Sequence, residues 1–166
     1  MYDAVGAASV QRISNPSLGQ TVDGMRNFAI QGATDMRIRR LVERICSRVQ
    51  SGDYASEVLS CYYWVCQNVR YMRDPYDVEL VKDPVRVVES GSGDCDDIAT
   101  LLASMMMTCG NKCSFLLACL DRSGMPSHVF TVVHTPNNGT VTLDPVANKS
   151  TGQMWQRMVK PILVAI

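Results

Sequence analysis

The hydrophobic periodicity of the chain changes from helical to strand-like near residue 110. Three upstream segments carry apolar residues at helical spacing: about 35–49, 54–69 and 94–109. Three downstream segments have the composition and alternation of strands: 113–120, 127–135 and 140–144. The turn Pro136-Asn137-Asn138-Gly139 separates the last two strands. Because a set of helices precedes an antiparallel sheet, the pattern predicts an α+β fold.

The third predicted helix is apolar around most of its circumference. Its apolar side chains repeat at helical spacing: Ile98, Leu101, Leu102, Met105 and Met106. A helix of this kind is buried at the centre of a domain. Asp94 is the expected N-cap, and Asp97 three residues later completes a capping box. We therefore expect a central helix that begins at Asp94 or Cys95.

The N-terminal region and the connection after the second helix lack a clear pattern. Residues 1–20 are small and polar, and 21–31 have weak edge-strand character. We therefore expect an N-terminal arm over residues 1–30, mobile or ordered by a partner, followed by a single domain over 31–166. Residues 74–90 are expected to form a long connection of the kind that often shapes a site.

The charge balance argues against several classes of partner. The 166 residues contain 16 Lys and Arg and 16 Asp and Glu, so the formal net charge is zero. A neutral chain gives no support for nucleic-acid binding or for attraction to an anionic membrane. No run of about 18 apolar residues occurs, so we expect no membrane span. The N-terminus lacks a basic segment followed by an apolar one, so a classical secretion signal is not expected.

Seven cysteines are a high and odd number for a chain of this length. They lie at positions 46, 61, 66, 95, 109, 113 and 119. Without a secretion signal, a disulfide framework is the poorer interpretation, and most of these cysteines fall in apolar runs, where they act as small hydrophobic residues. The spacing of Cys109 and Cys113 suits zinc, but no second Cys or His pair follows at a suitable distance. The sequence therefore predicts no metal site.

Cys95 lies where a glycine-rich turn meets the start of the central helix, within Gly91-Ser92-Gly93-Asp94-Cys95-Asp96-Asp97. Unpaired N–H groups and the helix dipole favour an anion there, so we expect a thiol that ionises easily. His128 and Asp144 follow on expected strands. Cys, His and Asp in this order predict a nucleophile, its base and the group that orients the base. The same three residues are also zinc-type ligands, although metal sites often draw their ligands in close pairs.

Neighbouring acids and a second histidine complicate this site. Asp94, Asp96 and Asp97 should raise the pKa of the Cys95 thiol by like-charge repulsion. His134 is a rival base on the same strand face as His128, but it lies six residues further on, roughly 20 Å at the rise of a strand. His134 also adjoins the turn, so His128 is preferred.

The register of the hairpin provides a structural test. Directly opposed residues in an antiparallel pair share a face. A loop with an odd number of residues after Thr135, or a bulge, places Asp144 opposite Phe130 and on the face of His128. A loop with an even number places Asp144 on the other face. We predict the odd loop or the bulge.

Four separate segments resemble the transglutaminase-like superfamily in order and spacing. These are Gly93-Asp94-Cys95-Asp96-Asp97 with its apolar helix, Trp64-Val65 with Asn68-Val69 and Tyr71, Ser127-His128-Val129, and Leu143-Asp144-Pro145. The resemblance covers about residues 35–147. It implies a papain-like core, in which a helix bearing the nucleophile packs against an antiparallel sheet bearing His and Asp. Small members with the Gly-Asp-Cys-Asp-Asp motif are similar to proteins encoded by tailed phages.

The resemblance implies a cysteine-dependent amide hydrolase, a peptidase or amidase, that works through a thioester acyl-enzyme. Cys95, His128 and Asp144 would form the triad, and the backbone N–H of Cys95 would stabilise the oxyanion. Trp64 or Gln67 is the expected second oxyanion donor. The expected partner is a peptide or protein amide, and no cofactor or metal is expected.

Two alternatives remain open on the same resemblance. One is a catalytically silent structural or assembly protein of a phage particle, in contact with other virion proteins. The other is a protein-glutamine acyltransferase, because an amine acceptor in place of water gives transamidation. The expected location is accordingly cytoplasmic or virion-associated.

Overall fold

The computed structural model of the protein describes residues 10–13, 17–75, 79–119, 126–137, 139–146 and 159–166. The helices in this part of the chain are α1 Leu18–Thr34, α2 Met36–Ile45, α3 Tyr54–Asn68, α4 Pro84–Ser90 and α5 Cys95–Thr108. The strands are β1 Val10–Ile13, β2 Arg70–Tyr71, β3 Glu79–Lys82, β4 Ser92–Gly93, β5 Lys112–Cys119, β6 His128–Thr135, β7 Gly139–Leu143 and β8 Val159–Ala165. The predicted mixed fold, with helices before an antiparallel sheet, is confirmed.

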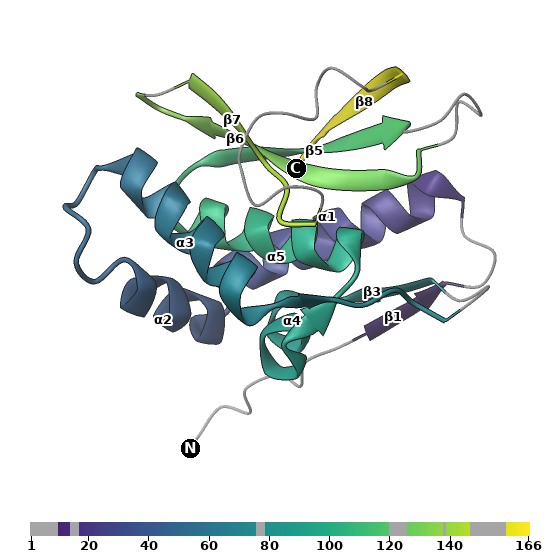
Figure 1. Ribbon diagram of the computed structural model, residues 1–166, viewed down its shortest axis with the longest axis horizontal. Coiled ribbons are helices and arrows are strands. Elements are labelled where there is room, and N and C mark those ends of the chain that lie inside the picture. Colours follow the sequence, from purple (N-terminus) through teal and green to yellow (C-terminus); the bar gives the residue numbers. More distant parts are fainter. Residues whose placement is uncertain (1–9, 14–16, 76–78, 120–125, 138, 147–158) are drawn as a thin grey trace.

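Helix α5 lies between the other helices and the sheet formed by β5 to β8 (Figure 1). Its apolar residues from Ile98 to Met106 are almost fully buried, as the sequence predicts. Buried hydroxyl groups join α5 to its neighbours: Ser104 Oγ donates to the carbonyl of Ala29 on α1 at 3.1 Å, and Thr131 Oγ1 on β6 donates to the carbonyl of Ala99 at 2.8 Å. A buried hydroxyl needs such an acceptor, so these bonds fix α5 against both layers.

The main sheet has the strand order β7-β6-β5-β8, and all neighbouring strands are antiparallel. Thr135 pairs with Gly139 and Thr131 pairs with Leu143, so the hairpin loop contains three residues. If the pairing of β6 and β7 is extended one residue beyond Thr131 and Leu143, Asp144 lies opposite Phe130 and on the face of His128. The prediction of an odd loop is confirmed.

The two faces of the sheet carry separate apolar clusters. The face toward α5 belongs to the main core and includes Phe115, Leu117, Val129, Val133 and Leu143. The other face carries a second cluster of buried side chains: Leu116, Ala118, Phe130 and Val132. Strands buried on both faces are rich in apolar residues throughout, which agrees with the composition of β5 and β6.

The expected strand over residues 21–31 is wrong, because these residues belong to helix α1. Ser17 and Gln20 form a capping box at its start, and the buried face includes Val22, Met25 and Ala29. The burial of α1 against α5 outweighs the weak strand character of this segment. The second half of the expected N-terminal arm is thus packed into the core, whereas residues 1–9 and 14–16 lie outside the described residues.

The expected long connection over 74–90 contains two regular elements, β3 and α4. Strand β3 pairs with β1, and α4 begins with Asp83 as N-cap and Pro84 in its first turn. Proline suits this place because the first turn of a helix needs no N–H from it. Within the described ranges, no helix combines the length and apolar character needed to cross a membrane.

Candidate active site

Cys95 is the first residue of α5. Its neighbours form the predicted capping box, since Asp94 accepts a hydrogen bond from the N–H of Asp97 and Asp97 accepts one from the N–H of Asp94. The first N–H groups of a helix have no acceptor within the helix. The backbone N–H of Cys95 is therefore positioned to stabilise negative charge close to its own side chain.

Two short strands hold the turn before Cys95. Strand β2 runs parallel to β4, with Tyr71 opposite Gly93, and the N–H of Met72 donates to the carbonyl of Gly93 at 2.8 Å. A Cβ atom on Gly93 would lie only 2.6 Å from the Cβ of Asp97. Glycine is therefore required at this close approach, and the pairing with β2 fixes where α5 begins.

His128 and Asp144 form a direct, buried pair. Nε2 of His128 lies 2.8 Å from Oδ2 of Asp144, and each residue is only 8% exposed. The other carboxylate oxygen of Asp144 accepts from the N–H of Val146 at 3.0 Å. Because Asp144 holds Nε2, the imidazole nitrogen left to exchange a proton with another group is Nδ1.

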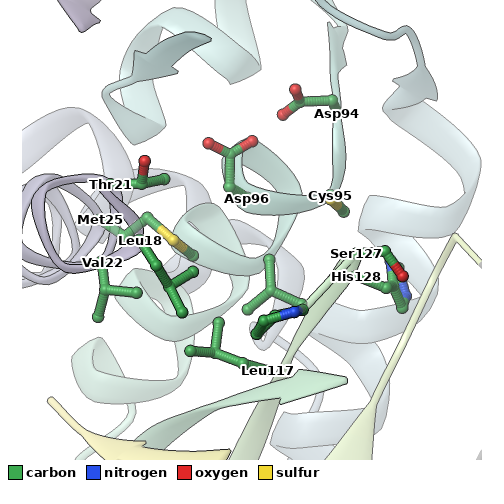
Figure 2. Close-up of a pocket in the computed structure, with 12 residues that line it drawn as sticks. Leu18, Thr21, Val22, Met25, Asp94, Cys95, Asp96, Leu117, Ser127 and His128 are labelled. Atoms are coloured by element: carbon green, nitrogen blue, oxygen red, sulfur yellow. The ribbon is translucent and has the colours of Figure 1, made fainter. Parts of the chain in front are cut away.

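Cys95 and His128 both line a cavity of about 240 Å³. In Figure 2, residues of α1 lie on one side of this cavity, and Ser127 and His128 lie on the other. The apolar part of the lining comes from Leu18, Val22, Met25 and Leu117, among others. Asp94 and Asp96, on either side of Cys95 in the sequence, add negative charge to the same cavity.

The thiol of Cys95 is harder to ionise than the sequence predicts. Burial, followed by the charges of Asp96 and Asp94, raises its pKa to about 12. Hydrogen bonds from the backbone N–H groups of Val129 and Asp96 act in the opposite direction but are outweighed. The expectation of an easily ionised thiol is therefore wrong, whereas the expected effect of neighbouring acids is present. At neutral pH the thiol carries its proton, and any nucleophilic attack must remove that proton during the reaction.

Asp97 lies behind the site in an ion pair with Lys82. Its carboxylate is fully buried and accepts hydrogen bonds from both the backbone N–H and the ammonium group of Lys82. Burial, with a further contribution from Asp94, raises the pKa of Asp97 to about 6. Burial alone would lower the pKa of Lys82, but its hydrogen bond to Asp97 raises it. The pair thus ties β3 to the first turn of α5.

The two expected oxyanion donors do not line the cavity beside Cys95. Trp64 is half-buried against the core, and Gln67 is exposed on α3. The rival base His134 lies towards the far end of β6, where its ring nitrogens are 3.2 Å from the hydroxyls of Ser114 and Thr140. His134 does not line the cavity either.

Sequence reasoning missed the contribution of α1 to the cavity. Leu18, Val22 and Met25 come from a region that was expected to be an arm with a weak strand. Two signals identify this helix in retrospect: the capping box of Ser17 and Gln20, and the helical spacing of Val22, Met25 and Ala29.

A sequence model described as the Transglutaminase-like superfamily matches residues 39–145. This segment is more than half of the chain and contains Cys95, His128 and Asp144. The chain belongs to this superfamily. The resemblance of its four sequence motifs is thereby confirmed, and so is the expected papain-like arrangement of helix and sheet.

Two solved structures share this fold at low sequence identity. A candidate cysteine protease from Cytophaga hutchinsonii has a TM-score of 0.55 and 12% identity, over 83% of this chain and 49% of that one. A candidate protease from Parabacteroides distasonis has a TM-score of 0.54 and 14% identity, over 75% of this chain and 26% of that one. The chain thus spans about a quarter to a half of these structures. No curated protein matches the chain in sequence.

Proposed function

We propose that this protein is a cysteine-dependent amide hydrolase, a peptidase or amidase, with Cys95 as nucleophile. The observation that carries the proposal is the buried 2.8 Å pair of His128 and Asp144 beside a cavity that Cys95 also lines. A nucleophile, a base and a group that orients the base are the parts that acyl transfer requires. The description of both structural neighbours as candidate proteases supports the same class.

The proposed reaction begins with a neutral thiol. Nδ1 of His128 takes the proton of Cys95 as the sulfur attacks the amide carbon, while Asp144 holds the imidazole through Nε2–H. The backbone N–H of Cys95 stabilises the oxyanion of the tetrahedral intermediate. His128 then gives its proton to the leaving amine, and the carbon–nitrogen bond breaks to leave a thioester. Water, deprotonated by His128, hydrolyses the thioester and restores the thiol.

The cavity suggests the class of amide. Leu18, Val22, Met25 and Leu117 provide an apolar surface next to the sulfur, so a substrate with an apolar side chain at the scissile amide fits best. The negative charges of Asp94 and Asp96 favour a cationic group nearby and disfavour an acidic one. We therefore propose a peptide substrate that combines an apolar side chain with a neighbouring amine.

A defined peptide mixture tests the proposal. The full chain is incubated with peptides that carry leucine, glutamate or lysine around the scissile amide, and the products are identified by mass spectrometry. Hydrolysis of leucine-containing peptides that Cys95→Ala abolishes and Cys66→Ala retains would support the proposal. Cleavage that persists in Cys95→Ala would contradict it. Addition of a primary amine separates hydrolysis from the alternative protein-glutamine acyltransferase, which would form an amide with the amine.

Two observations favour a catalytically silent structural or assembly protein, for example of a phage particle, as the second candidate. The pKa of Cys95 is raised to about 12, and Trp64 and Gln67 lie away from the cavity, so no second oxyanion donor is assigned. A structural protein of this kind would bind other proteins of the virion. Assembly of particles that is unaffected by Cys95→Ala, with the chain present in stoichiometric amounts, would support it against the enzyme.

A further inference from the structure

Three cysteines that are far apart in sequence come together at the end of α5 opposite Cys95. The Sγ atoms of Cys46, Cys61 and Cys109 all lie within 4.8 Å of one another, and those of Cys46 and Cys61 are 3.9 Å apart. Cys61 is buried on α3, whereas Cys46 and Cys109 are half-buried at the ends of α2 and α5. The cluster thus joins three helices and is accessible from outside through two of its members.

The spacing of the sulfur atoms fits a tetrahedral metal centre. With zinc–sulfur bonds of about 2.3 Å, tetrahedral geometry places thiolate sulfurs roughly 3.8 Å apart. The Cys46–Cys61 separation of 3.9 Å already matches this value, and the other separations require only a small contraction. Soft thiolate ligands select zinc over hard cations such as magnesium or calcium.

The electrostatic surroundings of the cluster favour a cation. Cys46 and Cys109 are the C-cap residues of α2 and α5, where the negative ends of two helix dipoles meet. Glu57 lies one helical turn before Cys61 on α3, and its charge contributes to raising the pKa of Cys46, for which burial is the main cause. The same charge acts on Cys109. The carboxylate of Glu57 thus adds negative charge near the cluster.

Hydrogen bonds link the thiols of the cluster to one another. Hydrogen bonding from Cys61 lowers the pKa of Cys109, whereas the hydrogen bond with Cys109 and burial raise the pKa of Cys61. A divalent cation binds the thiolate form of cysteine and displaces the thiol protons. Zinc binding should therefore become tighter as pH rises.

We propose that Cys46, Cys61 and Cys109 bind one zinc ion through their three thiolates, with a water molecule in the fourth position. The site is structural. Helix α5 has 14 residues, so at 1.5 Å per residue the ion lies about 20 Å from Cys95. It clamps α2 and α3 to the end of the helix that carries the nucleophile, and the proposal is independent of any activity at Cys95.

Sequence spacing does not reveal this site, because its ligands do not come in close pairs. Cys46 and Cys61 are 15 residues apart, and Cys109 follows much later in the chain. The pair with zinc-like spacing, Cys109 and Cys113, is split in the structure: Cys113 directs its thiol to the carbonyl of Ala103 at 3.9 Å instead. This proposal replaces the expectation from the sequence that the chain has no metal site.

The test is the metal content and cobalt spectrum of the full chain. The protein is purified under reducing conditions with zinc present, and its zinc is measured by mass spectrometry after gel filtration. We expect one zinc per chain. Replacement of zinc by cobalt should give thiolate-to-cobalt charge-transfer absorption in the near ultraviolet, and each zinc ion taken up by the apoprotein should release protons.

Matched variants separate the cluster from the other thiols. Cys46→Ser and Cys109→Ser should reduce the bound zinc to near zero and remove the charge-transfer band, while Cys66→Ser on the same helix as Cys61 should keep both. Glu57→Gln removes a negative charge that acts on Cys46 and Cys109, so it should weaken zinc binding without removing the charge-transfer band. Circular dichroism of each variant shows whether it is folded, and Cys46 and Cys109 are chosen because their half-buried positions tolerate serine better than Cys61 does.

Three results would overturn the proposal. The first is a folded, reduced protein that retains no zinc and gives no charge-transfer band with cobalt. The second is a mass two units lower under non-reducing conditions together with a mapped disulfide within the cluster in freshly purified protein. The third is zinc that Cys66→Ser removes as effectively as Cys109→Ser does.

Discussion

The reactivity of Cys95 depends on two opposing effects at the scale of single residues. Its position at the start of α5 favours an anion, but burial and two neighbouring carboxylates raise the pKa of the thiol to about 12. A resting thiolate is therefore scarce at neutral pH. The proposed mechanism consequently relies on His128 to remove the proton in the step that forms the carbon–sulfur bond.

The pH dependence of alkylation tests this state of the thiol. A thiol with a raised pKa reacts slowly with iodoacetamide at neutral pH, and its rate increases with pH beyond pH 10, because only the thiolate is alkylated. Asp96→Asn removes the carboxylate with the larger effect on the thiol pKa but keeps an oxygen that can accept from the N–H of Asp97. The variant should therefore lower the thiol pKa and speed alkylation of Cys95 at pH 8 by roughly 3–10-fold, since one pKa unit is a factor of ten.

Site-resolved mass spectrometry measures this rate for Cys95 alone. Asp53→Asn, a change at the exposed N-cap of α3, serves as the control and should leave the rate unchanged. An Asp96→Asn rate equal to that of the unaltered protein would show that the carboxylate does not act on the thiol.

At the scale of elements, the contact between α1, α4 and α5 depends on a glycine. A Cβ atom on Gly32 would lie 2.6 Å from both Pro84 Cγ and Ser104 Oγ. Ser104 is held by hydrogen bonds to the carbonyls of Ala29 and Thr100, so it cannot easily move away. Close packing of α1 in this position is what brings Leu18, Val22 and Met25 to the cavity.

Gly32→Ala should therefore destabilise the protein by about 1–3 kcal/mol through overpacking. Gly19→Ala is a matched control on the same helix, because its nearest neighbour would be 3.9 Å from the added Cβ. The control should be neutral or stabilise the protein by up to about 1 kcal/mol, since alanine is the better helix former. Urea unfolding measures both free energies, and equal effects of the two substitutions would contradict the proposed contact.

The ion pair of Lys82 and Asp97 joins β3 to α5, and Lys82→Met tests its importance. Removal of one partner of a buried pair leaves an uncompensated carboxylate, which typically costs about 3–5 kcal/mol at neutral pH. The pKa of Asp97 is about 6 in the folded protein, above its ordinary value of 3.8. The carboxyl is neutral below that pKa, so the difference in unfolding free energy between the two proteins should shrink as pH falls from 7 to 4. A difference that is independent of pH over this range would contradict the assignment of the pair.

At the scale of the whole molecule, the sequence predicted the parts with strong periodic or capping signals. The α5 capping box, the buried apolar face from Ile98 to Met106 and the odd hairpin loop follow from local patterns and the pleat of a strand. The convergence of His128 and Asp144 follows from that register. The order of Cys95, His128 and Asp144 along the chain predicted their roles, and the family resemblance pointed to the same three residues.

The rest depended on tertiary contacts that local patterns do not encode. The conformation of α1 is decided by its burial against α5, and the pairing of Lys82 with Asp97 joins residues 15 positions apart with no periodic signal. The thiol pKa of Cys95 depends on the depth of burial, which a sequence position at a helix start does not specify. The three-cysteine cluster likewise arises only where the ends of α2 and α5 meet α3.

The most direct test of the account is covalent capture of Cys95 by a substrate-like electrophile. The full chain is treated near neutral pH with a peptidyl vinyl sulfone that carries a leucine side chain, and the modified residue is mapped by mass spectrometry. The account predicts a single adduct on Cys95, formed roughly 100-fold more slowly in His128→Gln because the base is missing. Labelling of Cys95 at an unchanged rate in His128→Gln, or equal labelling of the half-buried Cys46, Cys66 and Cys109, would contradict it.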